Sequence, residues 1–358
     1  MKRIGMLTSG GDCQALNATM RGVVKGLTNL YKKDVEIYGF LQGYRGLMRN
    51  EYKLLKSEDF SGILTKGGTI LGSSRQPFKQ MDIPTEDGID KVPAMIDTYK
   101  KNKLDCLVVL GGNGSQKTAN LLSEKGLNVI GLPKTIDNDL WGTDMTFGFQ
   151  SAVDIATEAI DCIHTTASSH NRIFIVEVMG HKVGWITLHA GIAGGADIIL
   201  LPEIPYDIKK VCDALDKRTE QGKGFSILAV AEGAISKEVA KLPKKERKKV
   251  IAERKHPSVA YELAEQIRDY SGKEVRVTVP GHTQRGGSPD PFDRVLSSRF
   301  GAYAAELIKK QEYGQLVVLK NNEVTSIPLS ESAGKLKYVS PDDDIIHDAK
   351  LLGISFGD

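Results

Sequence analysis

The densest group of reactive side chains in this sequence lies in one short stretch and comprises Lys134, Thr135, Asp137 and Asp139. An apolar run, residues 128–131, precedes it and predicts a short buried strand, which Pro133 ends. Open α/β sheets bind their ligands at the carboxyl ends of their strands. A polar turn that bonds its own backbone explains one or two such residues. An ammonium, a hydroxyl and two carboxylates together favour a catalytic loop instead.

Three further segments, residues 9–11, 111–115 and more loosely 67–75, are rich in glycine and are predicted to follow strands. Glycine lets backbone N–H groups approach phosphate oxygens closely, and a following helix adds its positive N-terminal end. The segment 67–75 ends in Arg75. One such segment is a weak signal, but three beside an acid-rich loop predict a site for a polyphosphate and a metal ion.

The sequence matches neither of two common nucleotide-binding motifs in full. Residues 111–118 nearly match the Walker A pattern, but Gln116 occupies the position of its second glycine. Lys117 and Thr118 are therefore interpreted as ordinary helix residues. The Gly-x-Gly-x-x-Gly fingerprint is absent after the first predicted strand, which disfavours a dinucleotide.

Basic residues suited to a phosphorylated acceptor flank or follow strands in the second half of the chain: Arg172, Arg276, His282 and Arg285. Each alone is more often a surface charge than a ligand. Arginine nevertheless suits phosphate because its planar fork donates two hydrogen bonds at once. A polyanion on one side and an anionic acceptor on the other is the arrangement that phosphoryl transfer requires, with a carboxylate to take the acceptor proton.

These segments alternate with predicted strands and helices along the chain. Strands are predicted at residues 4–7, 35–40, 106–110, 128–131, 173–179, 198–201, 226–230 and 275–279, and helices at 15–27, 92–99 and 151–166. The alternation predicts an α/β protein of two similar Rossmann-like lobes, each a mostly parallel sheet with helices on both faces. Residues 237–255 carry many charges of both signs and are interpreted as a solvated helix or excursion.

Composition excludes several classes of protein. The 358 residues include 48 basic and 45 acidic side chains, and the resulting net charge of +3 is too small to indicate nucleic acid or a membrane surface. The first residues enter a strand directly, and no run is apolar enough to span a bilayer. The four cysteines, Cys13, Cys106, Cys162 and Cys212, are far apart, so we expect reduced thiols and a cytoplasmic protein.

Seven motifs, in this order, resemble those of the bacterial 6-phosphofructokinase family: residues 8–12, 67–75, 111–115, 133–139, 178–180, 191–195 and 281–289. The resemblance extends to about Tyr303 and implies a two-lobed enzyme that phosphorylates the 1-hydroxyl of fructose 6-phosphate with ATP and Mg²⁺. It implies a phosphoryl-donor lobe of residues 1–148 and about 284–333, and a sugar-phosphate lobe of residues 149–283 and about 334–358. It also implies a homotetramer, or a homodimer, whose subunits share their sugar-phosphate sites.

The resemblance assigns roles to individual positions. Asp137 corresponds to the general base for the sugar hydroxyl, Thr135 to a contact of the transferring phosphoryl group, and Lys134 lies in the same catalytic loop. The magnesium positions are Asn113 and Asp139. The donor positions are Gly11, Arg75, Gln76, Gly112, Asn113, Gly114 and Ser115. The sugar positions of one subunit are Thr135, Ile136, Asp137, Met179, Gly180, His181, Glu232, His282, Thr283, Gln284 and Arg285, and a neighbouring subunit contributes Arg172 and Arg276.

Two positions depart from the family pattern, and a further pair of residues gives a mixed signature. Asn113 stands where the family usually has an acid, and asparagine is a weaker partner for magnesium. His181 stands where an arginine is usual. Gly114 is typical of members that use ATP, whereas Lys134 is typical of members that use pyrophosphate.

Three hypotheses therefore stand. The first is an ATP-dependent 6-phosphofructokinase, which Gly114 favours because a side chain there would obstruct the α-phosphate of ATP. The second is a pyrophosphate-dependent enzyme, with sedoheptulose 7-phosphate as a further acceptor. The third is a non-catalytic, sugar-phosphate-binding regulatory subunit, suggested by Asn113 and His181 but opposed by Asp137 and Asp139.

Overall fold

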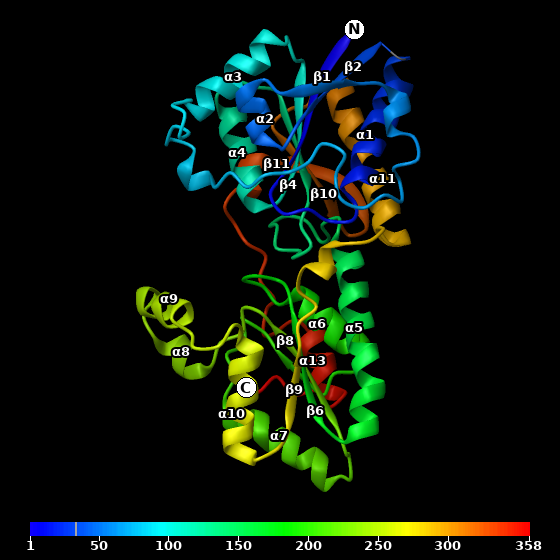
Figure 1. Cartoon of the computed structure of the whole chain (residues 1–358). Helices are drawn as coiled ribbons and strands as arrows, with labels where there is room; N and C mark the ends of the chain where they lie inside the picture. The colour runs from blue at the N-terminus through cyan, green and yellow to red at the C-terminus, as the bar shows by residue number, and fades with distance from the viewer. Residues whose placement is uncertain (33) are drawn as a thin grey trace. The chain divides into compact units, whose positions relative to one another are not determined.

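The computed structural model describes residues 1–32 and 34–358 and divides into two compact units. Unit 1 comprises Met1–Ser151 and Arg285–Lys337, and unit 2 comprises Ala152–Gln284 and Tyr338–Asp358. Each unit has its own sheet flanked by helices (Figure 1). The α/β class predicted from the alternating elements is confirmed.

Unit 1 is built on a seven-stranded sheet within the described residues. Its strands are β1 (Lys2–Ser9), β2 (Val35–Phe40), β3 (Tyr52–Leu55), β4 (Cys106–Gly111), β5 (Val129–Pro133), β10 (Gln315–Lys320) and β11 (Glu323–Pro328). They lie in the order β11-β10-β5-β4-β1-β2-β3, and the pairs β2–β3 and β10–β11 are antiparallel whereas the others are parallel. The chain leaves β1 to one side for β2 and returns on the other side for β4. The carboxyl ends of β1 and β4 therefore flank a topological switch point, where such sheets bind ligands.

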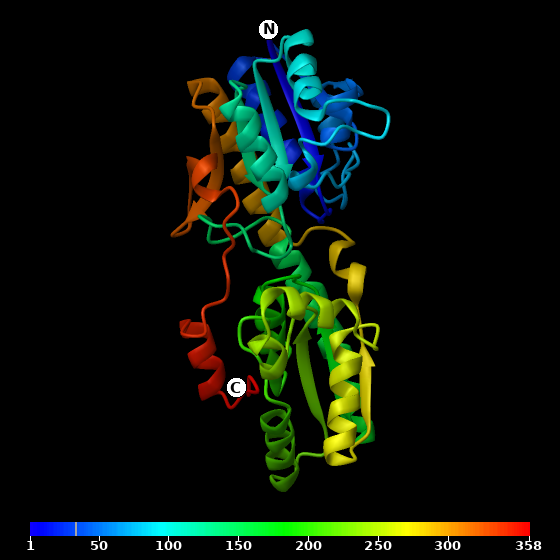
Figure 2. The same ribbon diagram turned by 90° about the vertical axis from the view of Figure 1, so that its left-hand side faces the viewer.

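Helices cover both faces of this sheet. They are α1 (Leu16–Tyr31), α2 (Tyr44–Arg49), α3 (Lys91–Lys101), α4 (Asn113–Glu124), α11 (Pro291–Lys310) and α12 (Leu329–Ser332). Helices α1 and α11 lie side by side on one face, and α2, α3 and α4 lie on the other (Figures 1 and 2). A β-carbon added to Gly301 of α11 would be 2.4 Å from the backbone nitrogen of Val23, so glycine allows α1 and α11 to pack closely.

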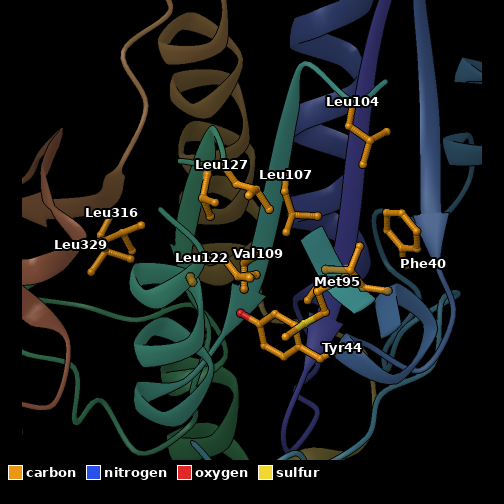
Figure 3. Packing of buried hydrophobic residues seen from close by; sticks show 14 of the residues in the cluster. Phe40, Tyr44, Met95, Leu104, Leu107, Val109, Leu122, Leu127, Leu316 and Leu329 are labelled. Carbon is orange, nitrogen blue, oxygen red and sulfur yellow. The ribbon is translucent and has the colours of Figure 1, made fainter. Parts of the chain in front are cut away.

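The core beneath α2, α3 and α4 positions the start of α4 (Figure 3). Leu107 and Val109 of β4 pack there with Tyr44, Met95 and Leu122 of the three helices. Fully burying each such side chain stabilises the fold by about 1.5–3 kcal/mol. The hydroxyl of Tyr44 donates to the carbonyl oxygen of Ser115 at 2.8 Å, so the core also holds the first turn of α4.

Unit 2 contains a smaller parallel sheet. Its strands are β6 (Ile173–Val178), β7 (Ile198–Leu200), β8 (Ser226–Ala231) and β9 (Val275–Thr278), in the order β7-β8-β6-β9. Its helices are α6 (Trp185–Ala193), α7 (Ile208–Glu220), α8 (Lys237–Lys241), α9 (Lys244–Ala252), α10 (Val259–Ser271) and α13 (Asp344–Leu351), and most of α5 (Phe149–His170) also belongs to it. Buried Glu177 of β6 accepts from the amide of Ala260 at 2.9 Å, so a carboxylate in the sheet caps the start of α10.

The structure of three segments adds to what the sequence predicted. Helix α4 begins at Asn113, inside the glycine-rich segment that was expected to be a loop. The charged stretch 237–255 forms two short exposed helices, α8 and α9, separated at Pro243. The tail packs on unit 2, where Ser355 forms a parallel bridge with Ile198 of β7. Among the described residues, no helix combines the length and apolar character needed to cross a bilayer.

Candidate functional site

Two loops meet at the switch point of the unit 1 sheet. Gly10, directly after β1, has a φ of +86°, which glycine adopts without strain. Its amide donates to the carbonyl oxygen of Ser74 at 3.1 Å, and the hydroxyl of Ser73 donates to the carbonyl oxygen of Gly10 at 2.6 Å. The glycine-rich segment after β1 and the one that ends in Arg75 are therefore joined by hydrogen bonds.

Lys134 joins the loop after β5 to the loop after β1. Its backbone amide donates to Gly111 at 3.2 Å, and its ammonium donates to the carbonyl oxygen of Gly11. The side chain is 3% exposed. Burial lowers the pKa of this ammonium, while nearby Asp137 acts in the opposite direction.

The acid-rich loop is held by short-range hydrogen bonds. The hydroxyl of Thr135 accepts from the amide of Asp137 at 3.0 Å, and the carbonyl oxygen of Thr135 accepts from the hydroxyl of Thr146 at 2.7 Å. Asn138 adopts a φ of +52°, a conformation that asparagine tolerates, and its side-chain oxygen accepts from the amide of Thr146 at 3.0 Å. Asp137, between these anchored residues, is partly exposed.

Two carboxylates in this loop influence one another. Burial, together with the negative charge of Asp137, raises the pKa of Asp139 from 3.8 to about 6. A divalent cation nearby would relieve both effects. The described residues contain no cluster of three or more His, Cys, Asp or Glu side chains suited to a metal ion. Magnesium is commonly held by one or two carboxylates together with substrate phosphates, so these oxygen donors fit magnesium.

The start of α4 completes a group that we call the unit 1 loop cluster: residues 9–12, 72–75, 111–115 and 134–139. Gly112 is the N-cap of α4, so the amides of the first turn lack partners within the helix and suit an anion. A β-carbon built on Gly114 has no heavy atom within 4 Å, so this position is open. Gln76, next to the cluster, lines a pocket of about 440 Å³ with residues of α2 and of 80–91.

A second group forms at the carboxyl ends of the unit 2 strands. One carboxylate oxygen of Glu232, after β8, accepts from the amides of Gly180 at 3.3 Å and His181 at 2.7 Å. The amide of Met179, after β6, donates to the side-chain oxygen of Gln284 at 3.3 Å. Residues from three segments of unit 2 thus meet at one edge of its sheet.

Two arginines lie at the opposite edge of the same sheet, near the amino ends of its strands. Arg172 directly precedes β6 and donates to Glu274 at 3.1 Å, and Arg276 of β9 donates to the other oxygen of that carboxylate. Because β6 has six residues at about 3.3 Å each, roughly 20 Å separate Arg172 from the residues after β6, and roughly 15 Å separate them from Arg276, which pairs with Phe174.

Comparison with known proteins identifies the family. A sequence model described as phosphofructokinase matches residues 3–308. The chain belongs to the phosphofructokinase family. It is 55% identical over 360 residues to a Spirochaeta thermophila protein named ATP-dependent 6-phosphofructokinase, covering 100% of this chain and 98% of the relative. It is 46% identical to a Bacteroides thetaiotaomicron protein named ATP-dependent 6-phosphofructokinase 3, covering 99% of this chain and 100% of that relative.

A solved phosphofructokinase structure has a similar fold. The Saccharomyces cerevisiae structure matches with a TM-score of 0.80 and 30% identity, over 93% of this chain and 45% of the yeast chain. This phosphofructokinase therefore spans less than half of the yeast chain's length. The family resemblance that the sequence motifs indicated is confirmed.

The residues expected to bind ligands divide between the units. Unit 1 gathers Gly11, Arg75, Gly112, Asn113, Gly114, Ser115, Lys134, Thr135, Asp137 and Asp139 in the loop cluster, with Gln76 beside it. Unit 2 gathers Met179, Gly180, His181, Glu232 and Gln284, with exposed His282 and Thr283 in the same segment as Gln284.

Two expected sugar residues have particular surroundings. Arg285 lies in unit 1, where its guanidinium donates to the carbonyl oxygen of Asp12 at 2.9 Å. Ile136 is fully buried, so neither its side chain nor its backbone is exposed to a ligand in this structure.

Residues 332–337 contact the loop cluster but were not singled out from the sequence. Lys337 donates its backbone amide to the carbonyl oxygen of Asp139 at 2.9 Å, and the carbonyl oxygen of Lys335 accepts from Asn113. No motif marks this segment, because its acceptors are backbone oxygens that any sequence provides.

Proposed function

We propose that this phosphofructokinase transfers the γ-phosphoryl group of ATP to the 1-hydroxyl of fructose 6-phosphate, giving fructose 1,6-bisphosphate. The main support is the 55% identity, over the full chain, with a relative named ATP-dependent 6-phosphofructokinase. In this proposal the unit 1 loop cluster binds the donor, and the residues at the carboxyl ends of the unit 2 strands bind the sugar. We further propose that the enzyme acts in the cytoplasm, in keeping with four cysteines that form no disulfide within the described residues.

Asp137 is the proposed general base. The amide of Asp137 is fixed by the hydroxyl of Thr135, and the loop around it is anchored by Asn138 and Thr146. A base held in this way meets the reacting hydroxyl at low entropic cost. It would accept the proton of the sugar hydroxyl as the oxygen attacks the γ-phosphorus, while Thr135 positions the transferring group.

The donor binds, in this proposal, along the loop cluster. The amides of Gly11 and of the first turn of α4 are proposed to bind its phosphates. Gln76, which lines the pocket beside the cluster, and the adjacent Arg75 are proposed to contact the rest of the nucleotide. Magnesium, when bound, supplies charge neutralisation of these phosphates, and Asp139 is the carboxylate proposed to hold it. Asn113, the other position proposed from the resemblance, offers at most one amide oxygen to the ion.

The sugar site requires a second copy of the chain. Met179, Gly180, Glu232, His282 and Gln284 belong to one edge of the unit 2 sheet, whereas Arg172 and Arg276 belong to the other. A single sugar phosphate cannot span the roughly 15–20 Å between them. We therefore propose that Arg172 and Arg276 bind the 6-phosphate of a sugar held by a neighbouring subunit, in a homotetramer or a homodimer.

Pyrophosphate is the alternative donor, and Lys134 is the residue that suggests it. Its buried hydrogen bond to Gly11 gives this lysine a role in joining two loops, whatever the donor. Gly114, in contrast, leaves open the space that a longer donor needs. The open position at Gly114 therefore favours ATP, and the contact of Lys134 is compatible with either donor.

A coupled assay with ATP and pyrophosphate in parallel tests the proposal. Aldolase and its coupling enzymes detect fructose 1,6-bisphosphate directly, so the readout does not depend on the donor. We expect turnover with MgATP and little with magnesium pyrophosphate. Efficient turnover with pyrophosphate alone would reverse the assignment of the donor, and failure with both donors would favour a regulatory subunit.

A further inference from the structure

The segment that ends unit 1, residues 332–337, contacts both sides of the loop cluster. The hydroxyl of Ser332 donates to the carbonyl oxygen of Trp141 at 2.7 Å, and Leu336 forms an antiparallel bridge with Leu140. These contacts fix the segment beside the residues that follow the acid-rich loop.

Lys337 strengthens this attachment. Its backbone amide donates to Asp139, and its ammonium donates to the carbonyl oxygens of Thr143 at 2.9 Å and Asp144 at 2.8 Å. The residue is half-buried, and burial lowers the pKa of the ammonium to about 8. A lysine in such surroundings loses much of its rotational freedom, so it holds residues 139–144 in one arrangement.

Asn113 connects the segment to the other side of the cluster. Its side-chain nitrogen donates to the carbonyl oxygen of Lys335, 222 residues away in the sequence. The contact requires a side chain that can donate a hydrogen bond. An ionised aspartate has the same size but accepts hydrogen bonds exclusively, and it would be repelled by the carbonyl oxygen.

We propose that residues 332–337 are a positioning element of the donor site, and that Asn113 serves as its hydrogen-bond donor rather than as a magnesium ligand. The segment bridges the start of α4 and the loop around Asp139. It thereby fixes the position of the phosphate-facing amides relative to the carboxylate of Asp139. This explains why an asparagine occupies position 113. The inference rests on the proposed donor site for its effect on activity, whereas the contact itself is tested without activity.

Asn113→Asp distinguishes the two roles, because they predict opposite signs. If Asn113 is a magnesium ligand, the added carboxylate should lower the magnesium concentration needed for half-maximal activity. If Asn113 is the donor to Lys335, the variant loses a hydrogen bond and gains a repulsion. We then expect the KM for MgATP to rise roughly three- to tenfold, with the KM for fructose 6-phosphate unchanged.

Hydrogen exchange provides the readout that is independent of activity. In the ligand-free protein, Asn113→Asp and Asn113→Ala should both accelerate amide exchange in residues 333–337. Asn120→Asp is the matched control, since Asn120 lies on the same helix and bonds Glu124 instead, at 2.8 Å. It should alter neither the exchange nor the KM for MgATP.

Several outcomes would overturn the inference. A lower magnesium requirement in Asn113→Asp, or unchanged exchange in residues 333–337 of both Asn113 variants, would each contradict it. If the wild-type protein turned over neither donor, the proposed function would fail, while the exchange measurement would still decide whether Asn113 holds the segment.

Discussion

The ammonium of Lys134 donates a hydrogen bond to the carbonyl oxygen of Gly11, which joins the loop after β5 to the loop after β1. From the sequence, this lysine pointed toward a pyrophosphate-dependent enzyme. In the structure it is buried and already engaged with the backbone. We therefore infer that it shapes the phosphate-binding surface, and that its charge assists whichever polyphosphate is bound.

The first prediction concerns Lys134→Gly. The variant loses a charged hydrogen-bond donor of the loop cluster, so kcat should fall roughly ten- to a hundredfold. Donor preference should remain with ATP, because the space at Gly114 is unchanged. Steady-state kinetics with both donors measure this, and Lys117→Gly, at a helix position outside the cluster, controls for the loss of a lysine. A preference that moved to pyrophosphate would be inconsistent with this role.

The second prediction concerns Asp137→Asn. Removing a general base typically slows a reaction by about 10²–10⁴-fold. The variant should fold and should bind fructose 6-phosphate as tightly as the wild type, because the contacts that fix the loop come from the backbone amide of Asp137 and from Thr146. Rapid kinetics and calorimetry of sugar binding separate the two effects. Near-normal turnover would remove Asp137 from this role.

The third prediction tests the shared sugar site. Arg172→Ala and Arg276→Ala should each raise the KM for fructose 6-phosphate, because each removes a cation from the proposed 6-phosphate site. Mixing Arg172→Ala protein with Asp137→Asn protein should restore part of the activity, since a mixed interface can combine an intact base with an intact arginine.

Subunit exchange must be verified in that experiment, for instance by native mass spectrometry of the mixed oligomers. Arg172→Ala protein mixed with itself is the matched control. Exchanged oligomers without any recovered activity would mean that Arg172 acts within its own subunit.

The features of the site that could be predicted from the sequence are each determined by residues close together in the chain. The acid-rich loop follows a strand with an unbroken apolar run, and β5 lies directly before it as predicted. The glycine-rich segment 9–11 likewise lies at the end of a strand, as predicted. Such features depend on neighbouring residues, so the sequence is enough to predict them.

The remaining features depend on contacts between distant residues. The bonds from Arg285 to Asp12 and from Asn113 to Lys335 join residues 273 and 222 positions apart, and each accepting atom is a backbone oxygen. Every residue has a backbone carbonyl oxygen, so the sequence does not indicate which of them accepts such a bond. The burial of Lys134 could not be predicted for a related reason. It results from the packing of loops that no short motif describes.

The fourth prediction concerns the stability of the magnesium-free protein. Burial and Asp137 raise the pKa of Asp139 from 3.8 to about 6, so the folded protein binds more protons than the unfolded chain between these values. The contribution of Asp139 to the free energy of unfolding therefore falls as the pH rises from about 4 to 6. Asp139→Asn removes this penalty and should be more stable than the wild type at pH 7, by up to about 3 kcal/mol.

Urea unfolding at pH 4, 5, 6 and 7 measures this difference, which should vanish near pH 4. Asp144→Asn, a nearby carboxylate, serves as a control. Parallel stability profiles for Asp139→Asn and the wild type would show that Asp139 is ionised at low pH in the folded state.

The last prediction concerns Gly114→Asp and the choice of donor. No heavy atom lies within 4 Å of a β-carbon at this position, so the fold should accept the side chain. A carboxylate in the first turn of α4 also interacts favourably with the helix dipole, so thermal stability should be unchanged or slightly higher. Any loss of activity must then come from the ligand. The added carboxylate would face the phosphates of ATP beyond the β-position, so the KM for MgATP should rise steeply, whereas pyrophosphate, which ends there, should be little affected. Gly114→Ala separates charge from size and should raise the KM much less. Equal use of MgATP by Gly114→Asp and the wild type would show that the donor does not pass this residue.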